Sequence, residues 1–284
     1  MQRIGCNRKG RQKAFLVAGI LYFDHPTLYF HAMRSIIANV KQELKKKYHR
    51  HLGPYRDVVV VSYPKSGRTW LRVMLNDLGI IPSYEHNGSQ NARGLPYQDL
   101  PDDKSAYSGN RVLFMVRDPR DTVVSAYFQM TKRHQAFEGS MSKFIRDDRY
   151  GIKKVLRFHE IWYNNRQVPV GFKMIRYEDL HGAPLETMEG VLDFFDGKKR
   201  HYKKLQKVID FYQFDNMHRL EQQGYFNHKF KGVLRPGDAN DQESYKTRKG
   251  KVGGFYAYFS EEDLAYCKAV MQENPNPFYS GDID

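Results

Sequence analysis

Cysteine and long apolar runs are both scarce in this chain of 284 residues. Its two cysteines, Cys6 and Cys267, lie far apart in the sequence, which indicates free thiols in a reducing compartment. The apolar run at residues 15–23 is too short to span a bilayer, and Asp24 follows it at once in place of a small-residue cleavage pattern. The sequence therefore predicts a cytoplasmic protein without a transmembrane segment.

Acidic residues are also in short supply, at 32 against 46 lysines and arginines, which gives a net charge of +14. A solvated basic surface is the simplest explanation, and binding to nucleic acid or to an anionic membrane is the next one. The hydrophobic content of 40% is enough for a sizeable core in one large domain or two. Repeats and low-complexity segments are absent, so composition alone assigns no function.

The most informative stretch runs from four consecutive valines at 58–61 into a turn at 64–69 and then into a helix. The valines suit a strand that is covered on both faces, and the apolar residues after the turn recur at helical spacing. Because the turn begins a helix, unpaired backbone N–H groups and the positive end of the helix dipole favour an anion there. Lys65, Ser66 and Thr69 add side-chain donors. The turn is therefore predicted to hold a phosphate.

The spacing within this turn differs from that of an ATPase P-loop. The P-loop places its lysine directly after the second glycine and follows it with a serine or threonine that holds magnesium. Here Lys65 precedes Gly67, the only glycine of the turn. A lysine-bearing turn of this kind predicts a nucleotide whose reacting group needs no metal.

Three blocks of the sequence, in the same order, resemble those of sulfotransferases that use 3′-phosphoadenosine 5′-phosphosulfate (PAPS). The segment 63–70 resembles the family's 5′-phosphosulfate loop, and the segment 111–128 resembles its 3′-phosphate motif. The segment 248–253 resembles the family's C-terminal Arg-Lys-Gly-x-x-Gly loop. One such motif is a weak signal, but three in the right order are a strong one. The similarity covers roughly residues 57–272, most of the chain.

The resemblance implies a set of residues that bind PAPS. Lys65 would stabilise negative charge on the oxygen that leaves sulfur, and Arg117 with Ser125 would hold the 3′-phosphate, since an arginine grips a phosphate with two hydrogen bonds. The family also puts Trp70 against the adenine. The full set of expected cofactor contacts is Lys65, Ser66, Gly67, Arg68, Thr69, Trp70, Arg117, Ser125, Tyr177, Phe214, Arg248, Lys249 and Gly250.

Several of these residues have a simpler structural interpretation as well. Tyr177 and Phe214 match adenine-contacting positions, but both would also be ordinary core aromatics. Arg117 could form a salt bridge with Asp121. Arg68 departs from the threonine that is usual at its position, and its side chain either adds charge near the sulfate or points to solvent.

Histidine suits the removal of a proton from an acceptor hydroxyl near neutral pH. The family carries its catalytic histidine ahead of the 3′-phosphate strand, where this chain has His86. The Lys-Thr-His-Leu-Pro setting of the cytosolic animal members is absent, but some bacterial members have a His-Asp pair, which His86-Asn87 nearly matches. His159 is an alternative candidate for the catalytic base only because it is a histidine. Its helical neighbours are apolar, which predicts a core position for it. We therefore expect His86 and Lys65 to be the catalytic residues.

From residue 57 the pattern alternates between strands and helices, which predicts a three-layer α/β/α fold with a central parallel sheet. The resemblance implies that this is the P-loop-like nucleotide-binding fold of sulfotransferases. The segment 224–254 is predicted to be a lid, because a loop of that length inside a compact domain is usually functional. We expect strands at 57–63, 111–116 and 168–176 and helices at 68–78, 119–130, 152–163, 184–195, 201–222 and 260–272.

The first 56 residues are predicted to form a helical extension that packs on a sulfotransferase domain at 57–284. A helix is expected at 27–50, and its end at 41–50 is densely basic. Two interpretations stay open for this helix. It is either a solvated helix packed on the domain or an element that faces the acceptor or touches an anionic membrane.

The sequence is thus interpreted as a metal-independent sulfotransferase that moves the sulfuryl group of PAPS to a hydroxyl or amine and releases adenosine 3′,5′-bisphosphate (PAP). We expect a polar small molecule, a natural product or a glycan as the acceptor, because the loop at 82–109 is polar, and we expect no nucleic acid. A P-loop-type small-molecule kinase is the main alternative, but it lacks the Lys-Ser/Thr pair after glycine. A basic nucleic-acid-binding protein is a second alternative. It explains the positive charge but does not explain why the three sulfotransferase-like blocks occur in the right order.

Overall fold

The computed structural model describes residues 14–17, 20–23, 53–86, 94–197, 202–227 and 234–279. The chain divides into two units, Met1–Pro54 and Tyr55–Asp284. In the first unit, β1 (Ala14–Val17) pairs with β2 (Ile20–Phe23) in an antiparallel arrangement. The helix predicted at 27–50, with its basic end at 41–50, lies outside the described residues.

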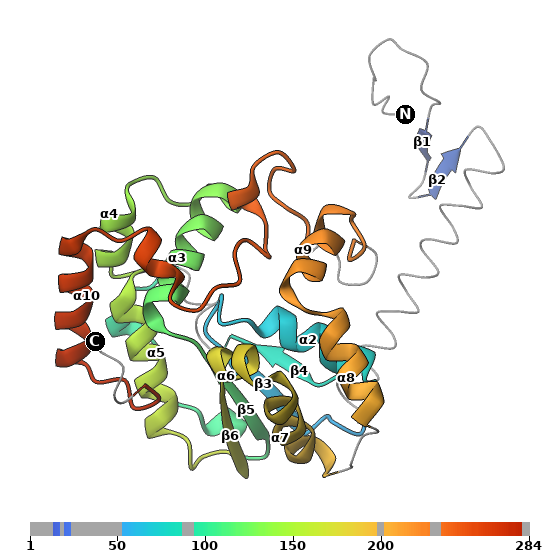
Figure 1. The fold of residues 1–284 in the computed structure, drawn as a ribbon. Helices are drawn as coiled ribbons and strands as arrows, with labels where there is room; N and C mark the ends of the chain where they lie inside the picture. Colours follow the sequence, from blue (N-terminus) through green and yellow to red (C-terminus); the bar gives the residue numbers. More distant parts are fainter. Residues whose placement is uncertain are drawn as a thin grey trace. The chain divides into compact units, whose positions relative to one another are not determined.

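The second unit is built on a parallel sheet of four strands in the order β4-β3-β5-β6 (Figure 1). In its register, Val61 of β3 lies opposite Glu85 on one side and Phe114 on the other. Because the strands are parallel, the segments that follow β3, β4 and β5 all leave the sheet at the same edge. The strands are β3 (Val58–Ser62), β4 (Ser83–Glu85), β5 (Arg111–Val116) and β6 (Gly171–Arg176).

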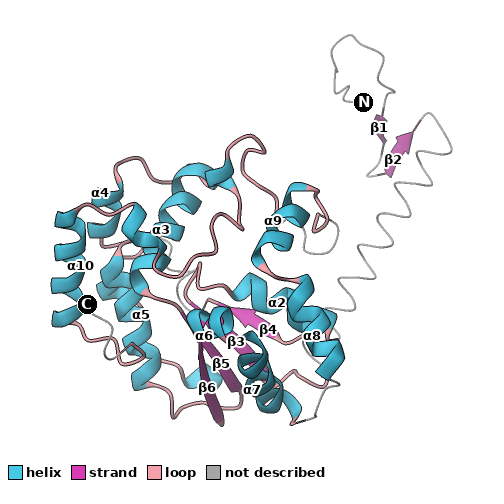
Figure 2. Ribbon diagram, viewed as in Figure 1, coloured by secondary structure: helices cyan, strands magenta, loops and turns pink. Residues whose placement is uncertain are grey.

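Helices cover both faces of this sheet (Figure 2). One layer consists of α3 (Pro119–Phe128), α4 (Met141–Arg146), α5 (Ile152–Asn164) and α10 (Glu261–Glu273). The other layer consists of α2 (Arg68–Asp77), α6 (Tyr177–Gly182), α7 (Pro184–Asp196), α8 (Tyr202–Phe211) and α9 (Phe214–Gln222). The predicted three-layer α/β/α arrangement with a parallel sheet is confirmed.

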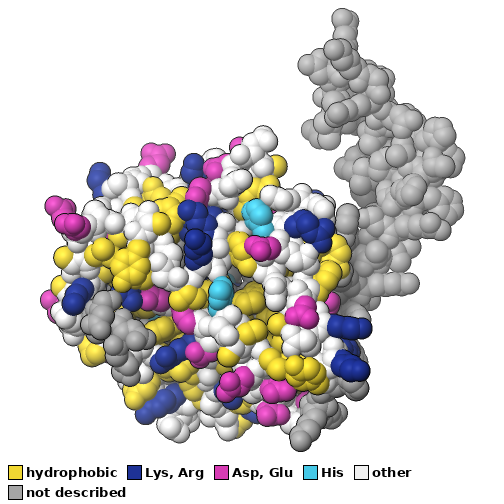
Figure 3. Space-filling model, in the orientation of Figure 1, with side chains coloured by type: hydrophobic (Ala, Val, Ile, Leu, Met, Phe, Trp, Pro, Cys, Tyr) yellow, Lys and Arg dark blue, Asp and Glu magenta, His cyan; other side chains and the backbone are white. Residues whose placement is uncertain are grey.

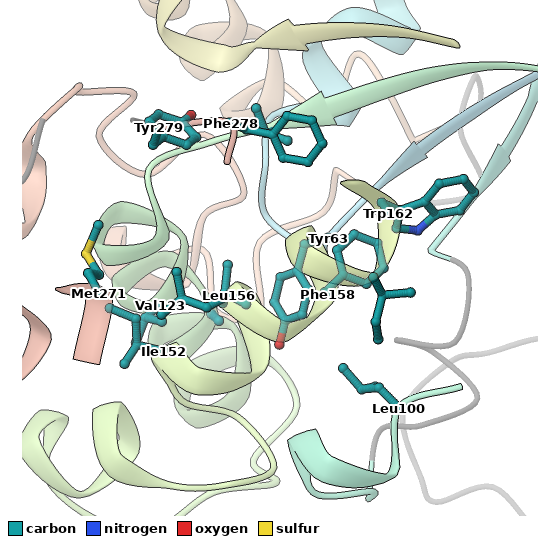
Figure 4. Packing of buried hydrophobic residues seen from close by; sticks show 14 of the residues in the cluster. Tyr63, Leu100, Val123, Ile152, Leu156, Phe158, Trp162, Met271, Phe278 and Tyr279 are labelled. Atoms are coloured by element: carbon teal, nitrogen blue, oxygen red, sulfur yellow. The ribbon is translucent and has the colours of Figure 1, made fainter. Parts of the chain in front are cut away.

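Alternate valines of β3 enter two different hydrophobic cores. Those at 58 and 60 pack with α2 and α7, whereas those at 59 and 61 pack with α3 and α5. All five residues of β3 are buried, as expected for a strand covered on both faces. The core on the α5 side is rich in aromatic rings, and Phe114 lies 5.8 Å from Phe158 and 5.5 Å from Trp162 between ring centroids. Figure 4 shows Phe158 and Trp162 among the aliphatic side chains of this core.

Two helices differ from the expected ones, and both differences shape the site. The helix expected at 201–222 is broken between α8 and α9, where the Tyr212 carbonyl accepts a hydrogen bond from Trp70 Nε1 at 2.6 Å and the Tyr212 hydroxyl donates to Asp77 at 2.7 Å. The helix expected at 119–130 ends at Phe128 and continues as a π-helix over Gln129–Arg133. Such π-helical turns are often found at functional sites.

Candidate functional site

A cavity of about 530 Å³ lies at the edge of the sheet where the segments after β3, β4 and β5 meet. Thirteen of the fourteen predicted site residues line it, and they come from six separate parts of the chain: 65–70, 86, 117–125, 177, 214 and 248–250. The exception is Ser66, which is 1% exposed and whose Oγ has no hydrogen-bond partner among the described residues. In the space-filling view, lysine, arginine and histidine side chains gather near the centre of the face shown (Figure 3).

The turn after β3 is compact because two of its residues adopt left-handed backbone conformations. Lys65 has a φ of 76° and Gly67 a φ of 89°. A Cβ at position 67 would lie 2.4 Å from Cδ2 of Tyr177, so only glycine fits there. Gly67 is also the N-cap of α2, and no side chain caps this helix. The first turn of α2 therefore offers its backbone N–H groups to an anion in the cavity.

Lys65 stands among other cations. Its Nζ donates a hydrogen bond to Oε1 of Gln129 at 3.2 Å. Burial lowers the pKa of Lys65 well below its usual value, and the charges of Lys246, Arg133 and Arg117 lower it further. A bound anion would favour the charged form of the lysine, because an opposite charge offsets both effects. This arrangement of like charges is typical of a site for a polyanion.

Arg117, which belongs to the second block, contacts both of the other blocks. Its Nη1 donates to the carbonyl of Lys65 at 3.3 Å, and its Nη2 donates to the carbonyl of Lys251 at 3.1 Å. The guanidinium lies 4.4 Å from the ring centroid of Tyr177. The salt bridge to Asp121 also forms, at 3.6 Å, yet Arg117 Nε is buried without a hydrogen-bond partner among the described residues. Arg117 can therefore still take part in binding an anion.

Two buried carboxylates hold the C-terminal loop on both sides of residues 248–250. Glu221 accepts the backbone N–H groups of Lys246 and Thr247, each at 2.8 Å. Asp121 accepts the N–H groups of Gly253 at 2.9 Å and Phe255 at 3.0 Å. These contacts fix where the loop enters and leaves the cavity. Mobility of the loop as a lid stays a prediction.

Arg248 and Lys249 make their contacts with one acidic residue of the same loop. Nη1 of Arg248 donates to Oε2 of Glu243 at 2.8 Å, and its guanidinium lies 4.2 Å from the ring centroid of Phe128. Lys249, whose side chain is 45% exposed, lies 3.9 Å from Glu243. Arg248 is thus oriented by a carboxylate and an aromatic ring, while Lys249 faces the solvent at the mouth of the cavity.

The aromatic residues predicted for the adenine form one wall of the cavity. The rings of Trp70 and Tyr177 meet edge to face with centroids 6.0 Å apart, and the Tyr177 hydroxyl donates to the carbonyl of Gly250 at 3.2 Å. Phe214 begins α9 and lies against Gly250 from the other side. Trp70, Tyr177 and Phe214 all line the cavity. The simpler interpretation of these residues as ordinary core aromatics therefore leaves out their exposure to the cavity.

A substitution at Gly250 tests whether this aromatic wall binds the nucleotide. It has a φ of 59°, and a Cβ there would lie 2.1 Å from Cδ2 of Phe214. Gly253 has a similar φ of 69°, but its Cβ would lie 4.0 Å from the nearest side-chain atom, on Tyr256. We expect Gly250→Ala to weaken PAP binding by about tenfold or more, because overpacking of this kind displaces neighbours at a cost of about 1–3 kcal/mol. Isothermal titration calorimetry measures this change.

Gly253→Ala is the matched control, because it carries the same backbone strain without the contact to Phe214. It should leave PAP affinity within about twofold of the wild type. Equal losses in the two variants would show that backbone strain alone matters, and that Phe214 and Gly250 do not form a nucleotide-binding wall.

His86 follows β4, directly beside the turn that carries Lys65. Its Nδ1 lies 2.9 Å from the carbonyl oxygen of Ser62. Because a carbonyl only accepts hydrogen bonds, Nδ1 carries the proton and Nε2 carries the lone pair. Nε2 lies 2.5 Å from Nη2 of Arg68 and accepts its hydrogen bond. Burial lowers the pKa of His86 to about 3, and the charge of Arg68 contributes. His86 is therefore a neutral imidazole with an accepting nitrogen.

Arg68 does not point to solvent, which was one of its two expected orientations. Besides its contact with His86, it donates to the backbone carbonyl of Glu85. His159, the competing histidine, is fully buried, and its Nδ1 lies 3.0 Å from Nδ2 of Asn276. It is absent from the residues that line the cavity. The sequence interpretation of His159 as a core residue therefore agrees with its position.

Sequence reasoning missed several residues of the cavity. Gln129 comes from the π-helical turn, and Arg72 lies one helical turn after Arg68 on α2. Lys246 lies two residues before Arg248, in the loop whose basic content was noted. Helical spacing on α2 could have indicated Arg72, but no sequence signal predicts that the C-terminal loop brings Lys246 close to His86.

The sulfotransferase domain family matches residues 94–277 of this chain, well over half of its length. The chain belongs to the sulfotransferase family. Flavonol 3-sulfotransferase of Flaveria bidentis is 23% identical over 264 residues, which span 76% of this chain and 81% of that protein. The 3-beta-hydroxysteroid sulfotransferase of Cavia porcellus is 22% identical over 283 residues, which span 87% of this chain and 93% of that protein.

Solved structures of sulfotransferases share the fold. A mouse sulfotransferase complexed with PAP gives a TM-score of 0.56 at 17% sequence identity, covering 78% of this chain and 85% of that one. Retinol dehydratase in complex with androsterone and PAP gives a TM-score of 0.57 at 18% identity, covering 81% and 83%. The predicted sulfotransferase fold is therefore confirmed.

The described residues contain neither a metal-binding cluster nor a membrane-spanning helix. In the part of the chain that the structure describes, no three histidine, cysteine or acidic side chains come together in a way that could hold a metal ion. None of the helices among these described residues combines the length and the apolar content needed to cross a membrane.

Proposed function

We propose that this sulfotransferase uses PAPS as its donor, transfers the sulfuryl group to a hydroxyl or amine of a small molecule or glycan, and releases PAP without a metal ion. The observation that carries this proposal is the meeting of all three sequence blocks in one cationic cavity. Ten lysines and arginines line it, and Asp121 is the only carboxylate among the described lining residues. A nucleotide with two separate phosphate groups needs such a surface.

The residues present fit PAPS in three ways. The turn at 64–69 offers the uncapped N-terminus of α2, together with Lys65, to the 5′-phosphosulfate. Arg117, Ser125 and Arg248 of the C-terminal loop line the same cavity and would hold the 3′-phosphate. Trp70 contributes an aromatic face for the adenine. We assign these roles to the matching residues of this chain.

PAPS supplies an activated sulfuryl group when bound. Lys65 would stabilise the negative charge that develops on the bridging oxygen as its bond to sulfur breaks, and this effect is strong because the half-buried lysine lines the cavity and is held by Gln129. His86 Nε2 would take the proton of the acceptor as the new bond from the acceptor oxygen to sulfur forms. Arg68 would exchange its hydrogen bond to Nε2 for one to the acceptor or the sulfuryl oxygens.

The names of relatives support small hydroxyl-bearing acceptors and a cytoplasmic location for this chain. Relatives are named for flavonols and for 3-beta-hydroxysteroids, and one solved relative holds androsterone. Two relatives in Arabidopsis thaliana are named cytosolic sulfotransferases. We infer a small-molecule acceptor and a cytoplasmic enzyme from these similarities.

A transfer assay tests the proposed function. The protein is incubated with PAPS, EDTA and a panel of phenols, alcohols and amines, and mass spectrometry follows the addition of one sulfuryl group. Product should form together with an equal amount of PAP. Product that forms only with ATP and magnesium, and gains a phosphoryl group instead, would favour the kinase alternative.

A further inference from the structure

Three cations line the cavity together with His86, where the acceptor hydroxyl would lie, and we name them the acceptor cations: Arg68, Arg72 and Lys246. Arg68 contacts His86 directly. The charges of Lys246 and Arg72 also act on the His86 imidazole, and the charges of Arg68 and Arg72 act on Lys246. Arg68 is also an expected cofactor contact and Lys246 also acts on Lys65, but neither Arg72 nor Lys246 is assigned above to a group of PAPS.

Two of the acceptor cations have little to bind within the described part of the chain. The Arg72 guanidinium lies 4.2 Å from the ring centroid of Tyr84, but its Nε is buried without a hydrogen-bond partner. Lys246 Nζ makes no hydrogen bond or ion pair with any described residue. Arg68 differs from them, because its guanidinium already donates hydrogen bonds to His86 and to the carbonyl of Glu85.

Nearby carboxylates offset this charge only in part: the charge of Glu221 acts on Lys246 and that of Glu85 acts on Arg68, but each carboxylate also holds another group. Glu221 accepts backbone N–H groups of the C-terminal loop, and Glu85 accepts the hydroxyl of Tyr107 at 2.6 Å. Burial lowers the pKa of Lys246 to about 8, and the charges of Arg133 and Arg68 contribute to the lowering. Such a cluster of like charges is unfavourable until an anion enters it.

We propose that the acceptor carries an anionic group of its own, held by Arg72 and Lys246 while its hydroxyl lies at His86. This inference rests on the proposed function and narrows its substrate class to hydroxyl-bearing acids, with a carboxylate, phosphate or sulfate a short distance from the nucleophile. Arg72 supplies a planar fork that suits such oxyanions, and Lys246 supplies a point charge from the facing loop. A neutral acceptor would bring no counter-charge to either cation.

Matched acceptors test the proposal. The pairs are 4-hydroxyphenylacetate with 4-hydroxyphenylacetamide and 4-hydroxyphenylpropionate with its amide, in which methylene groups insulate the phenol from the acid. With PAPS as donor, kcat/KM for the acid should exceed that for the amide by about 10–100-fold, the size expected for charge-assisted hydrogen bonds. Arg72→Gln and Lys246→Gln should each reduce this ratio by about tenfold. Lys203→Gln on the exposed surface of α8 is the control and should keep the wild-type ratio.

A charge reversal provides an independent readout. Lys246→Glu should turn the preference towards tyramine, which has a cation where the acids have a carboxylate. The proposal is overturned if acids and amides are sulfated equally well and the ratio is unchanged in both Gln variants. In that case sulfuryl transfer itself persists, so the proposed function stands. If PAPS supports no transfer and PAP does not bind, the proposed function fails and this inference with it.

Discussion

Lys65→Met should lower the rate of sulfuryl transfer by about 10²–10³-fold with every acceptor, whatever its acidity. Methionine keeps most of the buried stem and removes only the ammonium group, so the loss reports the charge at the leaving oxygen. The effect is large because Lys65 is half-buried, oriented by Gln129, and therefore preorganised where negative charge develops. Rapid-quench single-turnover kinetics at saturating PAPS separates this chemical step from product release.

Lys132→Met is the matched control for this prediction. Lys132 is 47% exposed and pairs with Asp241 at 3.2 Å, outside the residues that line the cavity. Its loss should change the single-turnover rate by less than about twofold, because exposed ion pairs contribute little. If Lys65→Met and Lys132→Met behave alike, Lys65 is a phosphate contact at most and has no role at the leaving oxygen.

His86→Ala should lower kcat by about 10²–10⁴-fold for an alcohol acceptor while PAP affinity stays nearly intact. A base matters most where the acceptor holds its proton tightly, so an acidic phenol should lose less. The structure supports this role because Nδ1 donates to the Ser62 carbonyl, which makes Nε2 the accepting nitrogen, and Arg68 contacts that nitrogen within the cavity. Steady-state kinetics with both acceptor types, and calorimetry with PAP, measure the two parts of the prediction.

The pH profile tests whether Arg68 tunes this base. A base with a lowered pKa stays unprotonated as the pH falls, so the wild type should keep its kcat/KM well below pH 6.5. Arg68→Thr removes the adjacent charge, which should raise the pKa of His86 and move the acid limb of the profile to higher pH. An unchanged acid limb in Arg68→Thr, or wild-type turnover in His86→Ala on an alcohol, would remove His86 as the base.

The sequence predicted the site well because each block is a local strand–turn–helix unit. The valine strand, the turn with Lys65 and Gly67, and the apolar period of α2 follow from neighbouring residues alone. Parallel strand order then brings Lys65, His86 and Arg117 to one edge, which is why positions 21 to 52 residues apart share a cavity. The resemblance to the family indicated what each of these residues would do, and the order of the parallel strands explains why they lie close together.

What the sequence could not predict depends on long-range contacts. The strand β4 has only three residues, which is too short for the alternation of apolar and polar residues that predicts a strand. The break between α8 and α9 is accompanied by the bonds of Tyr212 to Trp70 and Asp77, more than 130 residues away. The placement of Lys246 beside His86 depends on Glu221, which holds the loop from α9. None of these partners is adjacent in the sequence.

The central claim is that the three blocks together hold the two phosphate groups of one nucleotide. Calorimetric titration of the wild type and of Arg117→Ala with PAP and with adenosine 5′-phosphate, both in EDTA, tests it most directly. PAP should bind the wild type far more tightly than adenosine 5′-phosphate does. Arg117→Ala should weaken PAP by about 10–100-fold and leave adenosine 5′-phosphate nearly unchanged, because only PAP has the 3′-phosphate. Equal affinities of the wild type for the two nucleotides, or equal losses in the variant, would contradict the account.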